Sequence, residues 1–111
     1  MESQDQIQPQ IHVDQDFIDL TIDGYTAYLN FETYGGVLDV RKTFVPNELR
    51  GKGVAGKLVK AAYDYAREHH YECVGTCSYA VKWLERHPEY EGRPSEDYVP
   101  DSCAIGKHQA K

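Results

Sequence analysis

The chain has 111 residues, the size of one domain, and its hydrophobic content of 41% is enough for a packed core. Its net charge of −6 argues against a nucleic-acid-binding protein, whose surface is normally basic. The sequence has no apolar run long enough to span a membrane and no apolar signal segment near its start. Its three cysteines are an odd number, which favours free thiols in a reducing compartment. We therefore expect a cytoplasmic monomer that does not enter a membrane.

The first half of the chain is predicted to form an antiparallel meander. Residues 1–10 are polar and are expected to be flexible, and residues 11–13 could form a short first strand. Three longer strands are indicated by alternating apolar residues over residues 17–22, 25–34 and 37–45. Asp23-Gly24 and Gly35-Gly36 separate these strands, and such pairs are typical of two-residue hairpin turns.

An amphipathic helix is predicted from about Val54 to His69. Its buried stripe is expected to contain Val54, Leu58, Ala61 or Ala62, and Tyr65. Residues 71–76 indicate a short strand. Because a strand–helix–strand unit is right-handed and pairs its strands in parallel, this strand should lie beside residues 37–45.

A second helix is predicted over residues 79–87. Ser78 can cap its N-terminus, and Pro88 and Gly92 mark its end. Residues 91–111 show no clear period, so we expect a loose tail in which residues 98 and 99 could dock back on the domain. The sequence thus predicts an α+β domain, in which an antiparallel meander joins one parallel βαβ unit with two main helices.

The stretch between the meander and the first helix holds three glycines within six residues, Gly51, Gly53 and Gly56. Glycine lets a turn adopt positive φ and lets the backbone approach a ligand closely. A helix that begins here points its free N–H groups and the positive end of its dipole at the loop. The pattern therefore predicts an anion site, most often one for phosphate. Residues 50–67 hold five bases and one acid, which suits a polyanion, although a solvated helix face explains several of these charges as well.

One phosphate-binding motif fits this loop poorly. Gly51, Gly56 and Lys57 have the spacing of a nucleotide P-loop, G-x-x-x-x-G-K-[ST]. Leu58 stands where that motif requires the hydroxyl that holds Mg²⁺, so a nucleotide triphosphatase is disfavoured.

A second motif fits better. Arg50, Gly53 and Ala55 match Q/R-x-x-G-x-G/A, and this stretch resembles the pyrophosphate motif of the GCN5-related N-acetyltransferases. The wider sequence, over about residues 11–90, is similar to the small single-domain members of that superfamily. Four strings carry the resemblance in order and spacing: residues 42–46, 49–55, 76–79 and 87–90. A glycine-rich turn before an ordinary helix is the alternative.

The resemblance implies a trimmed acetyltransferase fold, with acetyl-CoA wedged where the central strands separate, and transfer of an acetyl group to an amine acceptor. The cofactor-binding residues that it implies are Phe44, Val45, Arg50, Gly51, Lys52, Gly53, Val54 and Ala55. The resemblance thus divides the chain into a flexible N-terminus (1–10), an acetyl-CoA-binding domain (11–90) and a loose tail (91–111). The alternative function is a non-catalytic CoA-binding module, because binding a pyrophosphate requires no base.

Cys77 is the candidate catalytic residue. It ends a strand and begins a helix, where the helix dipole favours the thiolate. The resemblance implies that a cysteine here faces the thioester and takes part in transfer. A small buried thiol that fills the corner between strand and helix is the alternative interpretation.

Lys42 marks a departure from the family pattern, which often has a histidine at this position. A protonated lysine cannot act as a base. Lys42 could instead be desolvated and reactive, but we expect its amine to reach solvent. Asp39 is then a candidate base and Tyr79 a candidate acid for the leaving thiolate, although Tyr79 could equally pack in the core.

The remaining histidines and cysteines do not indicate a metal site. His69, His70, Cys73 and Cys77 lack a C-x-x-C pair and a second ligand pair, so no metal is expected. Cys73 is expected in the core, and Cys103 lies in the tail.

Overall fold

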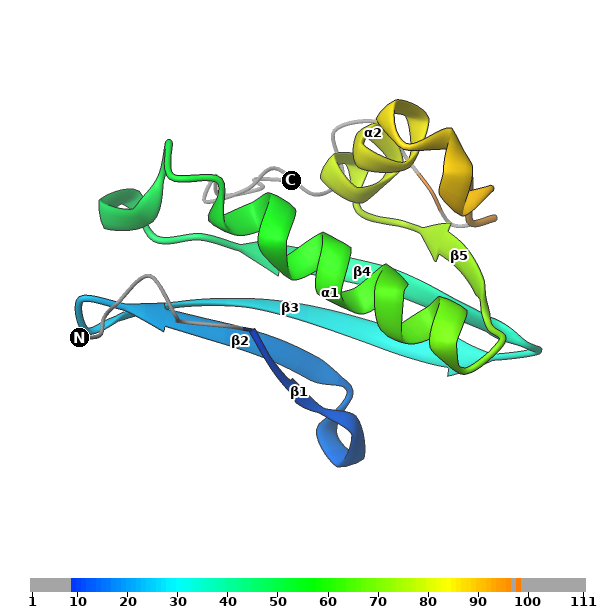
Figure 1. Ribbon diagram of the computed structural model, residues 1–111, viewed down its shortest axis with the longest axis horizontal. Coiled ribbons are helices and arrows are strands. Elements are labelled where there is room, and N and C mark those ends of the chain that lie inside the picture. The colour runs from blue at the N-terminus through cyan, green and yellow to red at the C-terminus, as the bar shows by residue number, and fades with distance from the viewer. Residues whose placement is uncertain (1–8, 97, 99–111) are drawn as a thin grey trace.

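The computed structural model describes residues 9–96 and 98, which form one mixed sheet with two α-helices (Figure 1). The strands are β1 (Gln10–His12), β2 (Phe17–Ile22), β3 (Tyr25–Tyr34), β4 (Val37–Phe44), β5 (Glu72–Gly75) and β6 (Arg93–Pro94). The helices are α1 (Val54–Glu68) and α2 (Ser78–Arg86), and short 3-10 turns cover residues 13–15, 47–49 and 88–90. The strand order in the sheet follows the chain; β1 to β4 are antiparallel, and β5 and β6 each run parallel to the preceding strand. These features confirm the predicted α+β fold.

Both predicted hairpin turns are present. Asp23 and Gly24 have φ values of 55° and 84°, and Gly35 and Gly36 have values of 53° and 82°. Two successive residues with positive φ form the turn whose twist matches that of the flanking strands. Each turn therefore fixes the register of its strand pair.

The main core lies between the sheet and α1, which runs along one face of it (Figure 1). The buried residues of the helix are Val54, Leu58, Val59, Ala62, Tyr63 and Ala66. Tyr63 was not predicted in this stripe, whereas Tyr65, which was, is only half-buried. Full burial of Tyr63 is tolerated because its hydroxyl donates a 2.6 Å hydrogen bond to the carbonyl of Val74.

The second helix begins one residue earlier than predicted. Cys77 occupies the N-cap position and Ser78 is the first helical residue, so the predicted cap at Ser78 is wrong. Ala80, Trp83 and Leu84 of this helix join the same hydrophobic core.

The sheet also extends past residue 90. Arg93 and Pro94 form β6 against β5, and the N–H of Ser95 donates to the carbonyl of Gly75 at 2.8 Å. The first residues of the predicted tail therefore belong to the sheet. Residues 1–8, 97 and 99–111, which include Cys103, lie outside the described residues, and the division of the chain at residues 10 and 90 stays a prediction.

Within residues 9–96, no helix is both long and apolar enough to cross a membrane. The described histidine, cysteine, aspartate and glutamate side chains form no group of three or more that could hold a metal ion.

Candidate functional site

The glycine loop lies between the end of β4 and the start of α1. Gly51 and Gly53 have φ values of 80° and 74°, in the left-handed region that residues with a Cβ atom rarely adopt. Gly53 is also the N-cap of α1. The two glycines therefore allow the chain to turn sharply into the helix.

A pocket of about 320 Å³ opens at this loop. It is lined by Val45, Leu49, Arg50, Gly51, Gly53, Val54, Ala55, Gly56 and Tyr79. Six of the eight predicted cofactor-binding residues are in this set, whereas Phe44 and Lys52 are not. Leu49 and Gly56 were missed, although both lie in the contiguous stretch that carries the motif. Tyr79 comes from α2, and sequence alone left its role open.

The N-terminus of α1 supplies backbone donors to the pocket. The N–H of Lys57 donates to the carbonyl of Gly53 at 3.2 Å, four residues earlier in the chain, as in an α-helix. The N–H groups of residues 54–56 come before this hydrogen bond. None of the described side chains caps this end of the helix. The residues that carry these donors line the pocket together with Arg50, and the positive end of the helix dipole points toward it, which gives the pocket the character of an anion site.

Gly56 and Tyr79 bring the two helices together at the pocket wall. A Cβ atom on Gly56 would lie 3.4 Å from the Tyr79 hydroxyl, so the glycine lets the two groups approach closely. Burial raises the pKa of Tyr79, against a smaller opposite effect of Arg86. The hydroxyl therefore stays protonated at neutral pH and can act as a donor toward the pocket.

The structure places Cys77 close to this region but not on the pocket wall. Its side chain is 0% exposed, and its Sγ lies 3.6 Å from Oγ1 of Thr43 on β4. An acyl group could reach Sγ only after Thr43 or neighbouring side chains moved. The catalytic role of Cys77 therefore stays a prediction.

The strands β4 and β5 part next to Cys77. Their pairing ends at Val40 and Gly75, while β4 continues to Phe44. The backbone N–H groups of Thr76 and Cys77 both donate to the carbonyl of Val40, at 2.9 and 3.1 Å. Residues 41–44 of β4 therefore extend beyond the last paired residue of β5.

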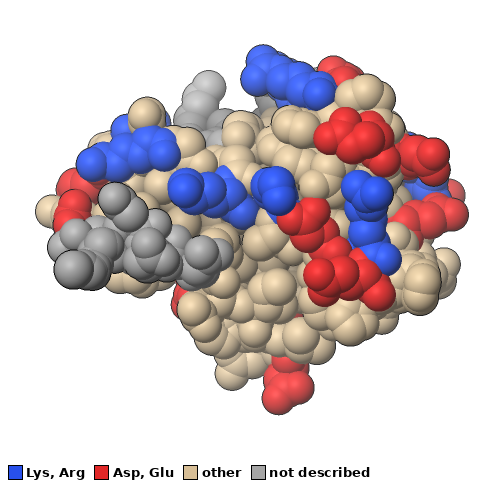
Figure 2. All heavy atoms as spheres, viewed as in Figure 1, with Lys and Arg blue, Asp and Glu red and all other residues tan. Residues whose placement is uncertain are grey.

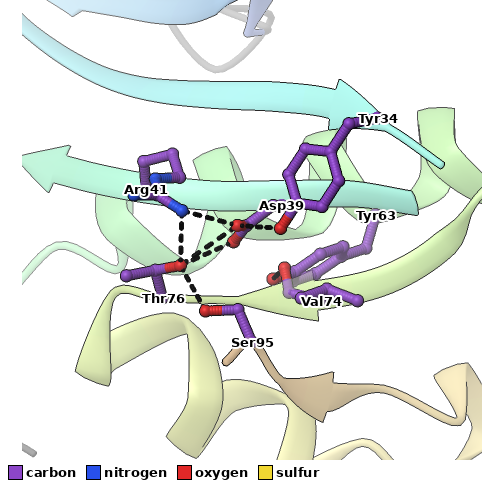
Figure 3. Close-up of polar contacts among 7 residues, drawn as sticks. All are labelled: Tyr34, Asp39, Arg41, Tyr63, Val74, Thr76 and Ser95. Carbon is purple, nitrogen blue, oxygen red and sulfur yellow. Dashed lines mark hydrogen bonds and ion pairs between the residues drawn. The ribbon is translucent and has the colours of Figure 1, made fainter. Parts of the chain in front are cut away.

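A buried polar cluster lies at the same junction (Figure 3). Asp39 is 0% exposed, and its Oδ2 accepts hydrogen bonds from the Tyr34 hydroxyl at 2.7 Å and from Nη1 of Arg41 at 2.9 Å. The Thr76 hydroxyl lies 3.0 Å from Oδ1 of Asp39 and 2.6 Å from the Ser95 hydroxyl. A β-bulge leaves Arg41 without a partner position on β3, which lets it turn toward Thr76.

Charge is distributed unevenly over the face that carries α1. Figure 2 shows a band of basic side chains that runs from the left across the middle of this face, whereas most of its acidic side chains lie in the right half. Lys42 lies at the surface, with its Nζ 6.0 Å from the ring centroid of Tyr28. Its amine reaches solvent as expected, so it is not a desolvated, reactive lysine.

The mixed sheet and the loop that opens onto the N-terminus of α1 define an α+β protein of the acetyltransferase type. The model of the family described as GCN5-related N-acetyl-transferase matches residues 17–92. The chain belongs to the GCN5-related N-acetyltransferase family, as its loop motif indicated.

Individual proteins and a solved structure are also similar to this chain. Protein NATD1 of Gallus gallus and of Mus musculus is 36% identical over 63 residues, which are 56% of this chain and 57% of each relative. The match thus spans little more than half the length of these relatives. The NMR solution structure of a GCN5-like protein from Staphylococcus aureus matches with a TM-score of 0.60 and 25% identity, over 89% of this chain and 92% of that one.

Proposed function

We propose that this protein is an acetyl-CoA-dependent N-acetyltransferase that transfers an acetyl group to an amine. The observation that carries the proposal is the pocket at the N-terminus of α1, where backbone N–H groups and Arg50 surround space for a polyanion. The pyrophosphate of CoA fits this donor set, because it is an anion that oriented amides and a guanidinium bind well. Family membership supports the same ligand.

The residues of the site have separate roles in this proposal. Arg50, Gly51, Gly53, Val54 and Ala55 would bind the pyrophosphate, and Val45 would contact the rest of the cofactor. Phe44 and Lys52 do not line the pocket. Acetyl-CoA would supply an activated thioester. The Tyr79 hydroxyl would donate a proton to the sulfur that leaves, since its raised pKa keeps it protonated. A cytoplasmic monomer is part of the proposal, and the free thiols of Cys73 and Cys77 support a reducing compartment.

Two transfer routes are compatible with this site, and burial favours one of them. Direct attack by the amine requires only that the acceptor reach the thioester where β4 and β5 part. Transient acylation of Cys77 requires its buried Sγ to become accessible. A non-catalytic CoA-binding module is the alternative function, and acceptor-dependent release of CoA distinguishes it from an enzyme.

Binding of CoA is tested by titration with NMR detection. The backbone amides of Gly51 to Ala55 should shift strongly, and Arg50→Ala should weaken binding by about 1.5–3 kcal/mol, the contribution of a charge-assisted hydrogen bond. Lys60→Ala is the matched control, because it removes a positive charge from α1 where Lys60 pairs with Asp64 at 2.8 Å. If millimolar CoA moves no amide in the loop, the proposed function is wrong.

A further inference from the structure

A second hollow, of about 420 Å³, lies on the face of the sheet away from α1. Its walls include Glu32, Tyr34, Arg41, Arg93, Ser95 and Glu96. The strand register explains the position of this hollow. Glu32, Asp39, Val74 and Arg93 are successive partners across β3, β4, β5 and β6, so they form one row on one face. Leu38 and Val40 alternate with Asp39 and belong to the core under α1, so this row faces the other way.

The hollow has two carboxylates that pair with neither of its arginines. Both of its arginines already have carboxylate partners: Arg41 pairs with Asp39 at 2.9 Å, and Arg93 pairs with Glu72 at 2.6 Å. Among the residues that the structure describes, Glu32 and Glu96 have no hydrogen-bond or ion-pair partner. Two uncompensated carboxylates beside a concave surface favour a cation.

Tyr34 adds a second feature that suits a cation. Tyr34 is 47% exposed, while its hydroxyl donates a 2.7 Å hydrogen bond to the fully buried Asp39 (Figure 3). An exposed aromatic ring that is fixed in place can bind an ammonium group over its face. The hollow therefore offers a ring and two carboxylates to one ligand, on a floor made rigid by the Asp39 cluster.

The hollow and the CoA-loop pocket lie on either side of one short segment. The hydroxyl of Thr76 bonds to Ser95, which lines the hollow, and Tyr79, three residues further along, lines the pocket at the glycine loop. Between them β4 and β5 part. A molecule held in the hollow could extend one end into this junction.

We propose that this hollow is the acceptor site and that it selects an amine with a second positive charge, such as a linear diamine. This inference rests on the proposed function. Glu32, Glu96 and the Tyr34 ring hold the distal ammonium, and the near amine attacks in its neutral form. The near ammonium first gives one proton to solvent, and its nitrogen lone pair then forms the N–C bond as the C–S electron pair leaves on sulfur. The sulfur would take a proton from the Tyr79 hydroxyl, which solvent reprotonates, and the second proton on nitrogen passes to solvent.

The first test measures binding without turnover. Putrescine, a linear diamine, should shift the backbone amides of residues 32–35 and 95–96 in NMR spectra of the whole chain, and n-butylamine should bind more weakly. The double variant Glu32→Gln/Glu96→Gln should weaken putrescine binding about two- to thirtyfold, the effect of losing two exposed ion pairs. Added salt should weaken it as well.

Glu85→Gln is the matched control, since it removes an exposed carboxylate on α2 that does not line the hollow. It should leave putrescine binding unchanged, and the spectra of all variants should show the same folded domain. The inference is overturned if putrescine moves no amide of the hollow, if n-butylamine binds as tightly, or if the double variant binds like the control.

Titration of the same samples with CoA separates this inference from the proposed function. If CoA shifts the loop amides but the diamine does not bind, the acetyltransferase proposal stands and the acceptor assignment falls. If the diamine binds but CoA does not, the hollow is a diamine site and its role as an acceptor site is refuted. If both bind, the ratio of kcat/KM for putrescine to that for n-butylamine should exceed tenfold and should fall in the double variant.

Discussion

Replacing Asp39 tests the polar cluster that joins the central strands to the segment after β6. Asp39 is 0% exposed and accepts hydrogen bonds from Tyr34, Arg41 and Thr76. Asp39→Asn keeps the size of the side chain and one acceptor oxygen but removes the negative charge. The guanidinium of Arg41, whose side chain is 31% exposed, then loses its carboxylate partner while its surroundings stay the same.

The expected cost follows from the contacts that lose their charge. A hydrogen bond to a charged group contributes about 1.5–3 kcal/mol and a neutral one about 0.5–1.5 kcal/mol. Weakening the contacts to Tyr34 and Arg41 in this way should lower the free energy of unfolding by about 2–3 kcal/mol. With a urea m-value of about 1.5 kcal/mol/M, the midpoint should fall by roughly 1.5–2 M. Trp83 is the single tryptophan and is buried, so its fluorescence reports the transition.

Glu72→Gln provides the control for the same loss of charge at the surface. Glu72 pairs with Arg93, but the two side chains are 65% and 55% exposed, so the loss should be at most about 1 kcal/mol. If Asp39→Asn unfolds at the same urea concentration as this control, the buried cluster does not stabilise the junction of β4 and β5 as we infer.

Three further outcomes are expected. Gly92→Ala should destabilise the fold by about 1–3 kcal/mol in urea titrations, because its Cβ would lie 2.6 Å from Cδ1 of the buried Leu84; an unchanged midpoint would contradict this contact. Burial raises the pKa of Cys73 to about 11, and burial with the hydrogen bond to Asp64 raises the pKa of Tyr90 to about 12. Because these folded-state pKa values exceed the ordinary values of 9.0 and 10.0, protonated Cys73 and Tyr90 stabilise the fold fully below about pH 9. This stabilisation should be lost between about pH 9 and 12. The variant Cys73→Ala/Tyr90→Phe should therefore show a smaller decline of melting temperature in that pH range. Cys77→Ser should retain acceptor-dependent release of CoA, whereas a fall of about a thousandfold or more would show that the thiol carries the acetyl group.

Local chemistry explains why much of the fold could be predicted. The hairpin turns need only two adjacent residues that tolerate positive φ, and the anion loop needs only glycines before a helix. The strands β2 and β3 have the predicted bounds because each alternates in polarity between two such turns. The loop pocket was largely predictable because it is built from contiguous backbone.

Long-range contacts explain what the sequence could not reveal. Tyr63 is buried because α2 places Trp83 with its ring centroid 5.8 Å away and because β5 offers the carbonyl of Val74. The two-residue strand β6 has no periodicity of its own and depends on the exposed edge of β5. The register across four strands assembles the hollow, so no single segment contains its pattern.

The geometry also bears on how the acceptor could lose its proton. Lys42, at the position where the family resemblance implies a histidine, lies at the surface. Both oxygens of Asp39 already accept hydrogen bonds, so protonating this carboxylate would disrupt the contacts that hold Thr76 and Arg41 in place. Neither group is arranged as a base for the acceptor amine. Under the proposed function, the chain therefore contributes chiefly by holding the amine and the thioester together at the junction of β4 and β5, an effect that can lower a barrier by about 7–11 kcal/mol without any proton transfer to the protein.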